Sequence, residues 1–481
     1  MTISAFARLA CLIGMVSSGF AQTTKEDVLV RIDEKKGLYE DMALQIWSYA
    51  EVGYQETRST ALLQQRLRAE GFTIEAGVAG MPTAFTATYT QGSGGPVIGI
   101  LGEFDALPGV AQEAIPERKA IPGQIAGHAC GHHVYGSGSA AAAAALKDWL
   151  QATGTPGTIR FYGCPAEEGG SGKVYLVRAG LFNDVDAVLR WHAGDRNEVD
   201  TGTTMANKSA KFRFQGIASH AASAPERGRS ALDGVEAMNH MANLMREHVP
   251  SDTRIHYVIT RGGEAPNVVP ANAEVFYYVR NPRREVIDDV WARLEQAAQG
   301  AALGTGTTVA WEIIHGAYEL LPNETLGRAI HANLTRVGGL TYSPEETAFA
   351  QAIGKTFPGG RPLDLSLATQ VQPFETGQPP SPNSTDSADV SWVVPTMGLN
   401  TATWVPGTPG HSWQAVASGG TTIALKGMVV AAKAMALTGI DLFTQPELRA
   451  EARAEFLRRR GADFVYKPLL GDRAPPLDYR K

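Results

Sequence analysis

The chain has 481 residues, of which 44% are hydrophobic and 19% are charged. This composition excludes a disordered or fibrous protein, and the length provides for two or three ordinary domains with a sizeable core. Lys and Arg number 43 against 49 Asp and Glu, so the formal net charge is −6, and like charges form no block. Because the basic surface typical of nucleic-acid binding is missing, we predict no nucleic-acid partner.

The first 21 residues have the pattern of an export signal. Arg8 carries the only charge, an apolar run extends from Leu9 to Val16, and small residues lead to Ala21. The run is too short to cross a bilayer, and the alternative is a buried N-terminal helix. No later stretch is apolar and long enough to predict a membrane span. We therefore predict a signal peptide over residues 1–21 and a mature protein that is periplasmic or secreted.

The segment after this signal alternates between helices and strands. Amphipathic patterns predict helices over residues 25–51 and 57–70. Short apolar runs bounded by Gly or polar residues predict buried strands at 96–101, 158–163 and 187–192. Functional side chains of an α/β sheet collect at the carboxyl ends of its strands, and these three strands end beside candidate ligands or their supports.

The pattern changes between Ala206 and Gly316. Four strands and two helices follow one another in the order β-α-β-β-α-β, which is that of a ferredoxin-like unit. The predicted strands cover residues 211–214, 254–260, 273–280 and 307–314, and the predicted helices cover 230–248 and 283–299. We therefore expect an α+β domain at residues 206–316, inserted into an α/β domain made of residues 22–205 and 317–481.

A cluster of histidine and cysteine residues lies directly before a predicted helix, in the sequence Gly-His-Ala-Cys-Gly-His-His at residues 127–133. Cys130 and His132 cannot share a helix face at this spacing, but a turn can direct both at one ion. Thiolate and imidazole together suit zinc best. The neighbouring His128 and His133 are open to a supporting or a structural role.

Three more segments hold candidate ligands, and each alone also has an ordinary explanation as a solvated loop or a structural histidine. Glu167 and Glu168 follow a predicted strand, His192 ends another, and His411 lies in a Gly/Pro-rich loop. The candidate ligands are Cys130, His132, Glu168, His192 and His411. Five ligands are too many for one catalytic zinc, which keeps a position open, but they suit a site with two metal ions.

Three of these motifs, taken in order, resemble the M20 metallopeptidase family. They are Gly-His-Ala-Cys-Gly-His, Pro-Ala-Glu-Glu-Gly-Gly and the late Gly-His-Ser-Trp. Residues 173–182 and 384–392 are most similar to its aminobenzoyl-glutamate hydrolase B-subunit-like amidohydrolases. The resemblance covers nearly the whole mature chain. It implies an α/β/α catalytic domain of the zinc-exopeptidase type with a central mixed sheet, and a lid and dimerisation role for the inserted ferredoxin-like domain.

The resemblance also implies roles for individual residues. The five ligands would hold two divalent ions, zinc in the first place and manganese as the alternative, with Cys130 as the bridge. Glu167 would be the general base and acid, and the Asp105 carboxylate would orient a ligand. In the lid, His220 would reach a neighbouring active site across a homodimer and polarise the scissile carbonyl. Asn267 and Arg280 would bind the carbonyl and the carboxylate of the substrate.

The implied function is an amidohydrolase that cleaves the amide bond of N-acyl or N-aroyl amino acids with metal-activated water. The export signal is atypical for the aminobenzoyl-glutamate subgroup. One alternative is a dipeptidase or aminopeptidase of the same fold, and another is a binding module without turnover. A third is a structural protein with a disulfide between Cys130 and Cys164 and no metal. The chain also departs from the family pattern, because His133 stands where relatives commonly have Asp or Asn.

Overall fold

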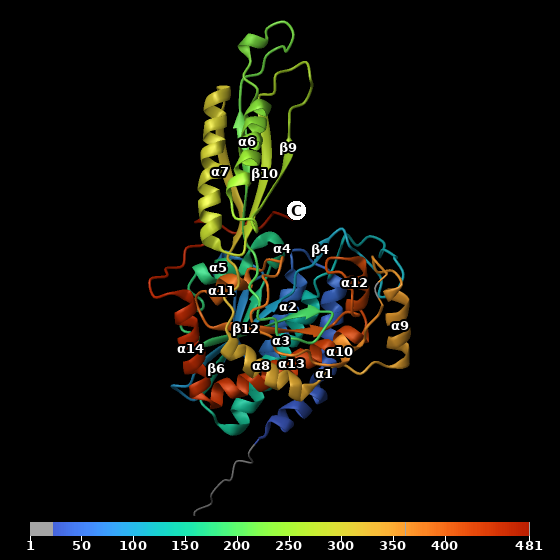
Figure 1. The fold of residues 1–481 in the computed structure, drawn as a ribbon. Helices are drawn as coiled ribbons and strands as arrows, with labels where there is room; N and C mark the ends of the chain where they lie inside the picture. The colour runs from blue at the N-terminus through green and yellow to red at the C-terminus, as the bar shows by residue number, and fades with distance from the viewer. Residues whose placement is uncertain (1–22, 361, 481) are drawn as a thin grey trace, which may run out of the picture.

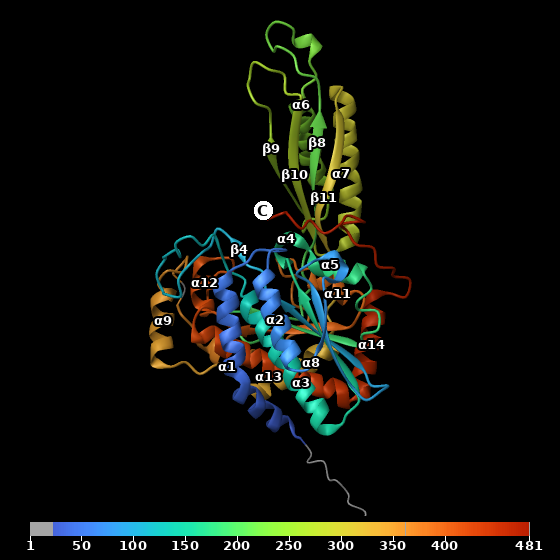
Figure 2. The same cartoon turned by 180° about the vertical axis from the view of Figure 1, so that it is seen from behind.

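The computed structural model describes residues 23–360 and 362–480, and the expected signal peptide lies outside them. A wide body built around one sheet supports a narrow unit of two helices and a second sheet, which projects from it (Figures 1 and 2). We call this narrow unit, residues 206–317, the lid. The α/β class and the mixed central sheet are confirmed, and both parts have their own hydrophobic core.

The body sheet has six strands in the order β1-β2-β6-β3-β7-β12. Its first three strands are antiparallel to one another in turn, and β6, β3, β7 and β12 run parallel. The parallel strands end at one edge, where the candidate ligands lie. The bounds are β1 Thr73–Ala76, β2 Phe85–Gln91, β3 Val97–Glu103, β6 Gly157–Cys164, β7 Ala187–Gly194 and β12 Thr396–Ala402; β4 Leu107–Pro108 pairs with β5 Ala126–Gly127 in a small separate sheet.

Helices α3 and α13 pack against the parallel strands, and α1 packs against both of these helices. The run Ala140–Ala145 in α3 is buried, so its small side chains allow the helix to approach the sheet closely. The helices of the body are α1 Lys25–Tyr49, α2 Thr57–Ala69, α3 His132–Thr153, α4 Glu167–Gly170, α5 Gly172–Arg178, α8 Glu324–Val337, α9 Pro344–Gly354, α10 Ser366–Thr369, α11 Ser387–Ser391, α12 Trp413–Gly419, α13 Thr422–Thr444 and α14 Pro446–Arg460, with a 3₁₀ turn η1 at Val78–Gly80.

Helix α13 corrects one expectation from the sequence. Within the described part of the chain, it is the helix that is long and apolar enough to cross a membrane, although no such stretch was expected. In the fold, 83% of its most apolar window is buried. Its apolar character therefore serves the core, where it packs between α3, α8 and the sheet.

The lid has the predicted β-α-β-β-α-β order. Its sheet is antiparallel, with strand order β11-β8-β10-β9, and α6 and α7 pack on one face. This order places the first and third strands in the middle, as in a ferredoxin-like unit. The bounds are β8 Ala206–Gln215, η2 Pro225–Arg227, α6 Ala231–Met245, η3 Arg246–His248, β9 Arg254–Arg261, β10 Asn272–Asn281, α7 Arg284–Thr305 and β11 Thr308–Ala317.

Candidate metal centre

A tight turn brings Cys130 and His132 to the same side of the chain. Gly131 lies between them with φ +77°, a conformation that glycine adopts without strain, and His132 is the first residue of α3. A Cβ atom at Gly131 would overlap the Cβ atom of Ala193 in β7. The glycine therefore lets the turn press against the strand that carries His192.

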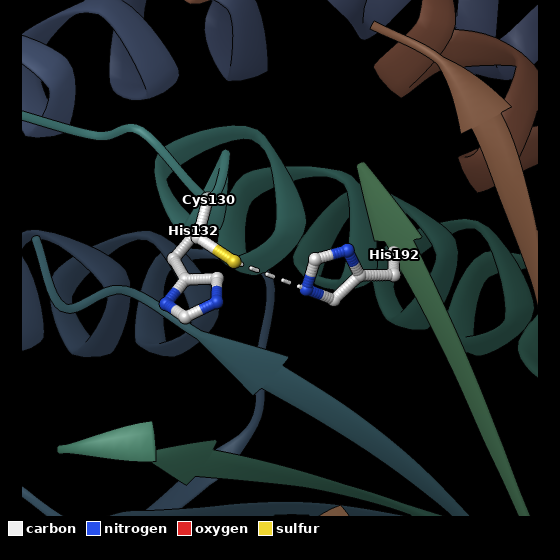
Figure 3. A group of neighbouring side chains, drawn as sticks. All are labelled: Cys130, His132 and His192. Carbon is white, nitrogen blue, oxygen red and sulfur yellow. Dashed lines mark hydrogen bonds between the residues drawn. The ribbon is translucent and has the colours of Figure 1, made fainter. Parts of the chain in front are cut away.

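His192 points from β7 toward the turn, and its Nε2 lies 3.6 Å from the Cys130 Sγ (Figure 3). The other ring nitrogen, Nδ1, lies 2.8 Å from the Ala193 carbonyl oxygen. Burial lowers the pKa of His192 to about 4, so its imidazole is neutral at ordinary pH. A neutral ring with one nitrogen directed inward is the form that binds a metal ion.

The candidate ligand atoms form overlapping groups, and within each group they lie within 4.8 Å of one another. These groups are Cys130, His132 and His192; Cys130, Glu168 and His411; and His132, Glu167 and Glu168. All five residues predicted as ligands therefore come together, and Cys130 belongs to two of the groups. Glu167, the predicted base and acid, lies beside them.

His411 joins this cluster from the far end of the chain. Its backbone N–H donates to the Ala129 carbonyl over 3.0 Å, which holds the late loop against the turn at Cys130. The ring Nε2 lies 3.2 Å from Glu168 Oε1, and this contact raises the pKa of His411. The side chain of His411 is 58% exposed, so the cluster is open to solvent on this side.

Asp105 fixes two members of the cluster at once. One of its oxygens lies 2.8 Å from His132 Nδ1, and the other accepts the backbone N–H of Glu168 over 3.0 Å. Burial alone would lower the pKa of His132, but Cys130 and the carboxylates of Asp105 and Glu103 raise it well above its usual value. The geometry agrees with the orienting role that the resemblance implies, because the bond at Nδ1 leaves Nε2 directed inward.

Sequence reasoning missed a buried ionic network behind His132. Lys173 Nζ lies 2.7 Å from Glu103 and 2.5 Å from Asp386, and the three side chains are at most 1% exposed. The second oxygen of Glu103 lies 3.1 Å from His132 Nε2. The sequence offered only a weak signal, a charge beside an apolar run at Glu103 and at Lys173, since a buried charge needs a partner. Asp386 stands in a polar run and could not be recognised as that partner.

Three buried atoms at the cluster have no hydrogen-bond partner among the described residues. They are Glu103 Oε2, His132 Nε2 and Glu168 Oε1. The contact of 3.1 Å between Glu103 and His132 and that of 3.2 Å between Glu168 and His411 are ion-pair contacts without hydrogen-bond geometry. Buried polar atoms are normally paired, so unpaired ones at a single place indicate a missing ligand. Sulfur, imidazole nitrogen and carboxylate oxygen are donors that suit zinc and related divalent ions. The residues present therefore fit a metal site.

Glu167 has the electrostatic surroundings of a proton-transfer group. Desolvation raises its pKa well above its usual value, and the negative charges of Glu103 and Glu168 raise it further. Its carboxyl group therefore holds a proton more firmly than an exposed glutamate does. Groups with shifted pKa values beside a metal cluster are typical of general acids and bases.

The remaining histidines and the second cysteine of the cluster region have structural contacts. His128 Nε2 lies 3.0 Å from the Ile46 carbonyl oxygen, and His133 Nε2 lies 2.9 Å from that of Gly419. Burial lowers the pKa of His133 to about 4 and that of His128 well below its usual value. Cys164 is buried and, like Cys130, is a free thiol. The disulfide alternative is therefore wrong for this structure.

The lid does not bring two of its predicted residues to the cluster. His220 and Asn267 are exposed and lie in the two loops at the tip of the lid, far from α4 (Figures 1 and 2). The Asn267 carbonyl oxygen accepts the N–H of Ala221, so the two loops are joined. Within the described chain, these residues contact each other's segments rather than the candidate ligands.

Arg280 lies at the opposite end of the lid, near the body. It lines a cavity of about 710 Å³ together with Arg254, His256 and Tyr278 from the lid sheet, and with Pro380 and other residues from the body. At the same end of the lid, His315 of β11 contacts the Ser171 hydroxyl group, three residues after Glu168. Burial and, to a smaller extent, the charge of Arg280 lower the pKa of His315 to about 4.

Comparison with known proteins identifies the family. Residues 99–397 match the model of peptidase family M20/M25/M40. The chain is 41% identical to the B subunit of p-aminobenzoyl-glutamate hydrolase from Escherichia coli (strain K12), with 88% of this chain and 93% of that protein covered. It is 29% identical to Xaa-Arg dipeptidase of Mus musculus, over 92% of this chain and 94% of that protein.

Solved structures have the same fold. A dinuclear metal-binding peptidase of the M20 family from Bacillus subtilis matches with a TM-score of 0.57 and 19% identity, over 87% of this chain and 99% of that one. An aminobenzoyl-glutamate utilization protein from Klebsiella pneumoniae matches with a TM-score of 0.56 and 19% identity, over 84% and 98%. The α/β body with its clustered metal-ligand side chains is thus that of a metal-binding hydrolase. The chain belongs to peptidase family M20/M25/M40.

Proposed function

We propose that this protein is a two-metal amidohydrolase that cleaves the amide bond between an acyl or aroyl group and an amino acid. The observation behind this proposal is the pair of ligand groups that share Cys130, with Glu167 beside them. Relatives named for p-aminobenzoyl-glutamate and for indole-3-acetyl-aspartic acid hydrolysis support the substrate class. Both names describe an amino acid joined through an amide to an aromatic acyl group.

The proposed ligands are Cys130, His132, Glu168, His192 and His411, with zinc as the first candidate and manganese as the second. Cys130, His132 and Glu168 each belong to two of the ligand groups, and we assign the bridge between two ions to Cys130, as the resemblance to the family implies. Bound divalent ions would supply Lewis-acid activation of the scissile carbonyl and of the attacking water.

The proton transfers are assigned to Glu167. Its carboxylate takes a proton from the attacking water and returns it to the amide nitrogen as the carbon–nitrogen bond breaks. The raised pKa of this group favours both steps, because a carboxyl group of ordinary acidity would give up its proton before the leaving nitrogen needs it.

Substrate selection is assigned to the cavity at the base of the lid. The side chain of Arg280 makes no hydrogen bond with other described residues, and its guanidinium carbon lies 5.6 Å from the centre of the Tyr278 ring. The guanidinium nitrogens can therefore bind a carboxylate with two parallel hydrogen bonds. Arg254 and His256 lie in the same cavity together with one acidic residue, Asp252, so the excess of basic groups suits an amino acid that has a second acidic group.

Two assignments extend beyond one chain. We place His220 and Asn267 in the active site of a second copy of the chain, in a homodimer formed through the lid, because both residues are exposed at its tip.

We also propose export to the periplasm or outside the cell through residues 1–21. Mass spectrometry of the protein from its native host tests this, since export predicts a mature chain that begins near Gln22.

The decisive experiment counts bound metal and then screens acyl- and aroyl-amino acids. We expect two divalent ions per chain in the wild type and in Glu167→Gln. Turnover by this variant should fall by roughly 10²- to 10⁴-fold, as expected for the loss of a general acid and base. A variant that is as fast as the wild type would remove Glu167 from the mechanism.

The dipeptidase relative favours a second candidate function, cleavage of a peptide with a free amino terminus. Paired substrates that differ only in acylation of the amino group distinguish the two functions. Faster hydrolysis of the free amine would replace our proposal with the dipeptidase activity. Tight binding of acylated amino acids without any hydrolysis would instead indicate a binding module.

A further inference from the structure

The chain after α14 has no regular secondary structure, but it is held at many points. We call residues 469–480 the C-terminal strap. In both views, the red C-terminal trace passes between the base of the lid and the segment that holds α4 (Figures 1 and 2). The strap is therefore placed to contact the lid and the candidate metal centre.

The first half of the strap is bound to the lid. Leu469 is part of the lid core, whereas its neighbour Leu470 is part of the body core. Arg473 Nη1 donates to the carbonyl oxygens of Ile313 and Ile314 over 2.5 and 2.7 Å. At this point β11 has an irregularity against β8, between Ile313 and His315, which leaves carbonyl groups unpaired in the sheet. The strap therefore completes the hydrogen bonding of the lid strand.

The middle of the strap is bound to the body. Arg178 at the end of α5 donates to the carbonyl oxygens of Gly471 and Arg473, over 2.9 and 2.8 Å. Gln55 Nε2 donates to the Leu477 carbonyl over 2.8 Å. These bonds fix the path of an otherwise irregular segment, because they pair its backbone with side chains of the body.

The last described residues of the strap reach Glu168. The Tyr479 hydroxyl and the Arg480 Nη2 each donate to the Glu168 carbonyl oxygen over 2.9 Å. The Tyr479 ring packs edge-to-face on Tyr54 at a centroid distance of 5.7 Å. A Cβ atom at Gly53 would overlap the Tyr479 hydroxyl, so a glycine makes room for this contact. The seat for Tyr479 is thus built into the body.

The loop that receives these bonds needs external support. Ala166 and Ser171 have φ values of +54° and +59°, which are unfavourable for residues with a side chain, and Gly169 has +86°. Such a backbone persists only where its surroundings hold it. Asp105 holds the N–H of Glu168, and the strap holds its carbonyl oxygen. Both peptide groups that flank the Glu168 side chain are therefore fixed.

We propose that Tyr479 and Arg480 are positioning residues for the metal ligand Glu168, and that the C-terminal strap couples this ligand to the lid. The inference rests on the proposed function of Glu168 as a ligand. It predicts that loss of the two donors weakens metal binding and catalysis, while substrate binding at the lid changes little.

The test compares Tyr479→Phe, Arg480→Ala and the double variant with the wild type. Zinc affinity is measured by competition with a chelator, and amide hydrogen exchange of residues 165–172 is measured in the metal-free protein. We expect the double variant to lose on the order of 10- to 100-fold in zinc affinity and in kcat, with a much smaller change in KM. Exchange of the loop amides should become faster.

Two control variants separate positioning from general stability. Asp478→Asn changes an exposed neighbour in the strap and should leave both measurements unchanged. Arg480→Lys keeps a donor and should restore part of the zinc affinity that Arg480→Ala loses. If the double variant does not fold, Tyr479→Phe decides the question with the same two measurements, because it keeps the ring that packs on Tyr54.

A double variant that binds zinc as tightly as the wild type, with unchanged exchange of residues 165–172, overturns the inference. Failure of the proposed function has a different signature. A wild-type protein that binds zinc but cleaves no acylated amino acid would refute the amidohydrolase assignment. The strap would still be tested, because neither zinc affinity nor amide exchange depends on a substrate.

Discussion

The body and the lid differ in how they hold the residues predicted to act on a substrate. In the body, five candidate ligands from distant segments meet at the carboxyl edge of one sheet, and Asp105 and the backbone fix several of them. In the lid, His220 and Asn267 lie exposed on tip loops. One chain therefore assembles the candidate metal centre, whereas the substrate contacts proposed at the lid tip require a second chain.

The comparison is tested most strongly at Cys130. If the body alone makes the metal centre, Cys130→Ala should weaken zinc binding by roughly 10²- to 10³-fold, about the share of one ligand in a four-ligand site. Hydrolysis should fall accordingly. The control is Cys164→Ala, since Cys164 is the other free cysteine of the described chain and its thiol donates to the Tyr162 carbonyl. Mass spectrometry measures the metal content of both variants. Equal metal content in Cys130→Ala and Cys164→Ala would contradict the assignment of Cys130 as a metal ligand.

The proposal that the lid tip contributes to the active site of a second chain is tested by mixing two variants. We expect His220→Ala to lower kcat by roughly 10²-fold or more, as for loss of a donor to the developing oxyanion. Refolded together in equal amounts, His220→Ala and Glu167→Gln should regain roughly a quarter of the wild-type activity, because half of the dimers contain one intact site. A mixture that stays as inactive as its components would refute an active site shared between two chains.

The cavity at the base of the lid predicts a smaller effect. Arg280→Ala should reduce kcat/KM by roughly 10- to 100-fold for substrates with a free carboxylate, since a charged hydrogen bond contributes about 1.5–3 kcal/mol. Methyl esters of the same substrates should show almost no difference between variant and wild type. An equal loss for acid and ester would mean that Arg280 supports the fold rather than the carboxylate.

The smallest predicted effect concerns the contact between lid and body at His315. Burial lowers the pKa of this residue from 6.5 to about 4, so the unfolded chain binds a proton that the folded chain does not bind. Stability is therefore lost as the pH falls from 6.5 toward 4. His315→Asn should reduce this loss in the free energy of unfolding by at most about 3 kcal/mol, which is the free energy that corresponds to the pKa difference. Urea unfolding at pH 7 and 4.5 measures it, with the exposed His240→Asn as the control.

The sequence was sufficient for the parts of the fold that follow local patterns. Alternating and apolar runs predicted β3, β6 and β7 and the order of the lid elements, because burial imposes a period on each strand and helix. Candidate ligands could be predicted because they stand in recognisable motifs at strand ends. The apolar length of α13 was missed, and only its place between α3, α8 and the sheet shows that it is a core helix.

Two features of the site could not be predicted, since they depend on contacts between remote segments. One is the buried network of Lys173, Glu103 and Asp386. These residues are far apart in the chain, and they pair only because the fold buries them together. The other is the C-terminal strap, which has no periodicity, so no sequence pattern predicts that Tyr479 and Arg480 donate to the Glu168 carbonyl oxygen. In both cases, a charged group or a hydrogen-bond donor pairs with a group in a remote segment, and no sequence pattern identifies that partner.

The lid interrupts the body between β7 and α8, and this has a consequence for the timing of assembly. Cys130, His132, Glu168 and His192 are synthesised before the lid, but β12 and His411 follow it. The parallel sheet therefore stays incomplete, and the cluster lacks a ligand, until the whole lid has been made. A site made of all five candidate ligands can thus form only after His411 has been synthesised, when little more than α12 to α14 and the strap remains to be added.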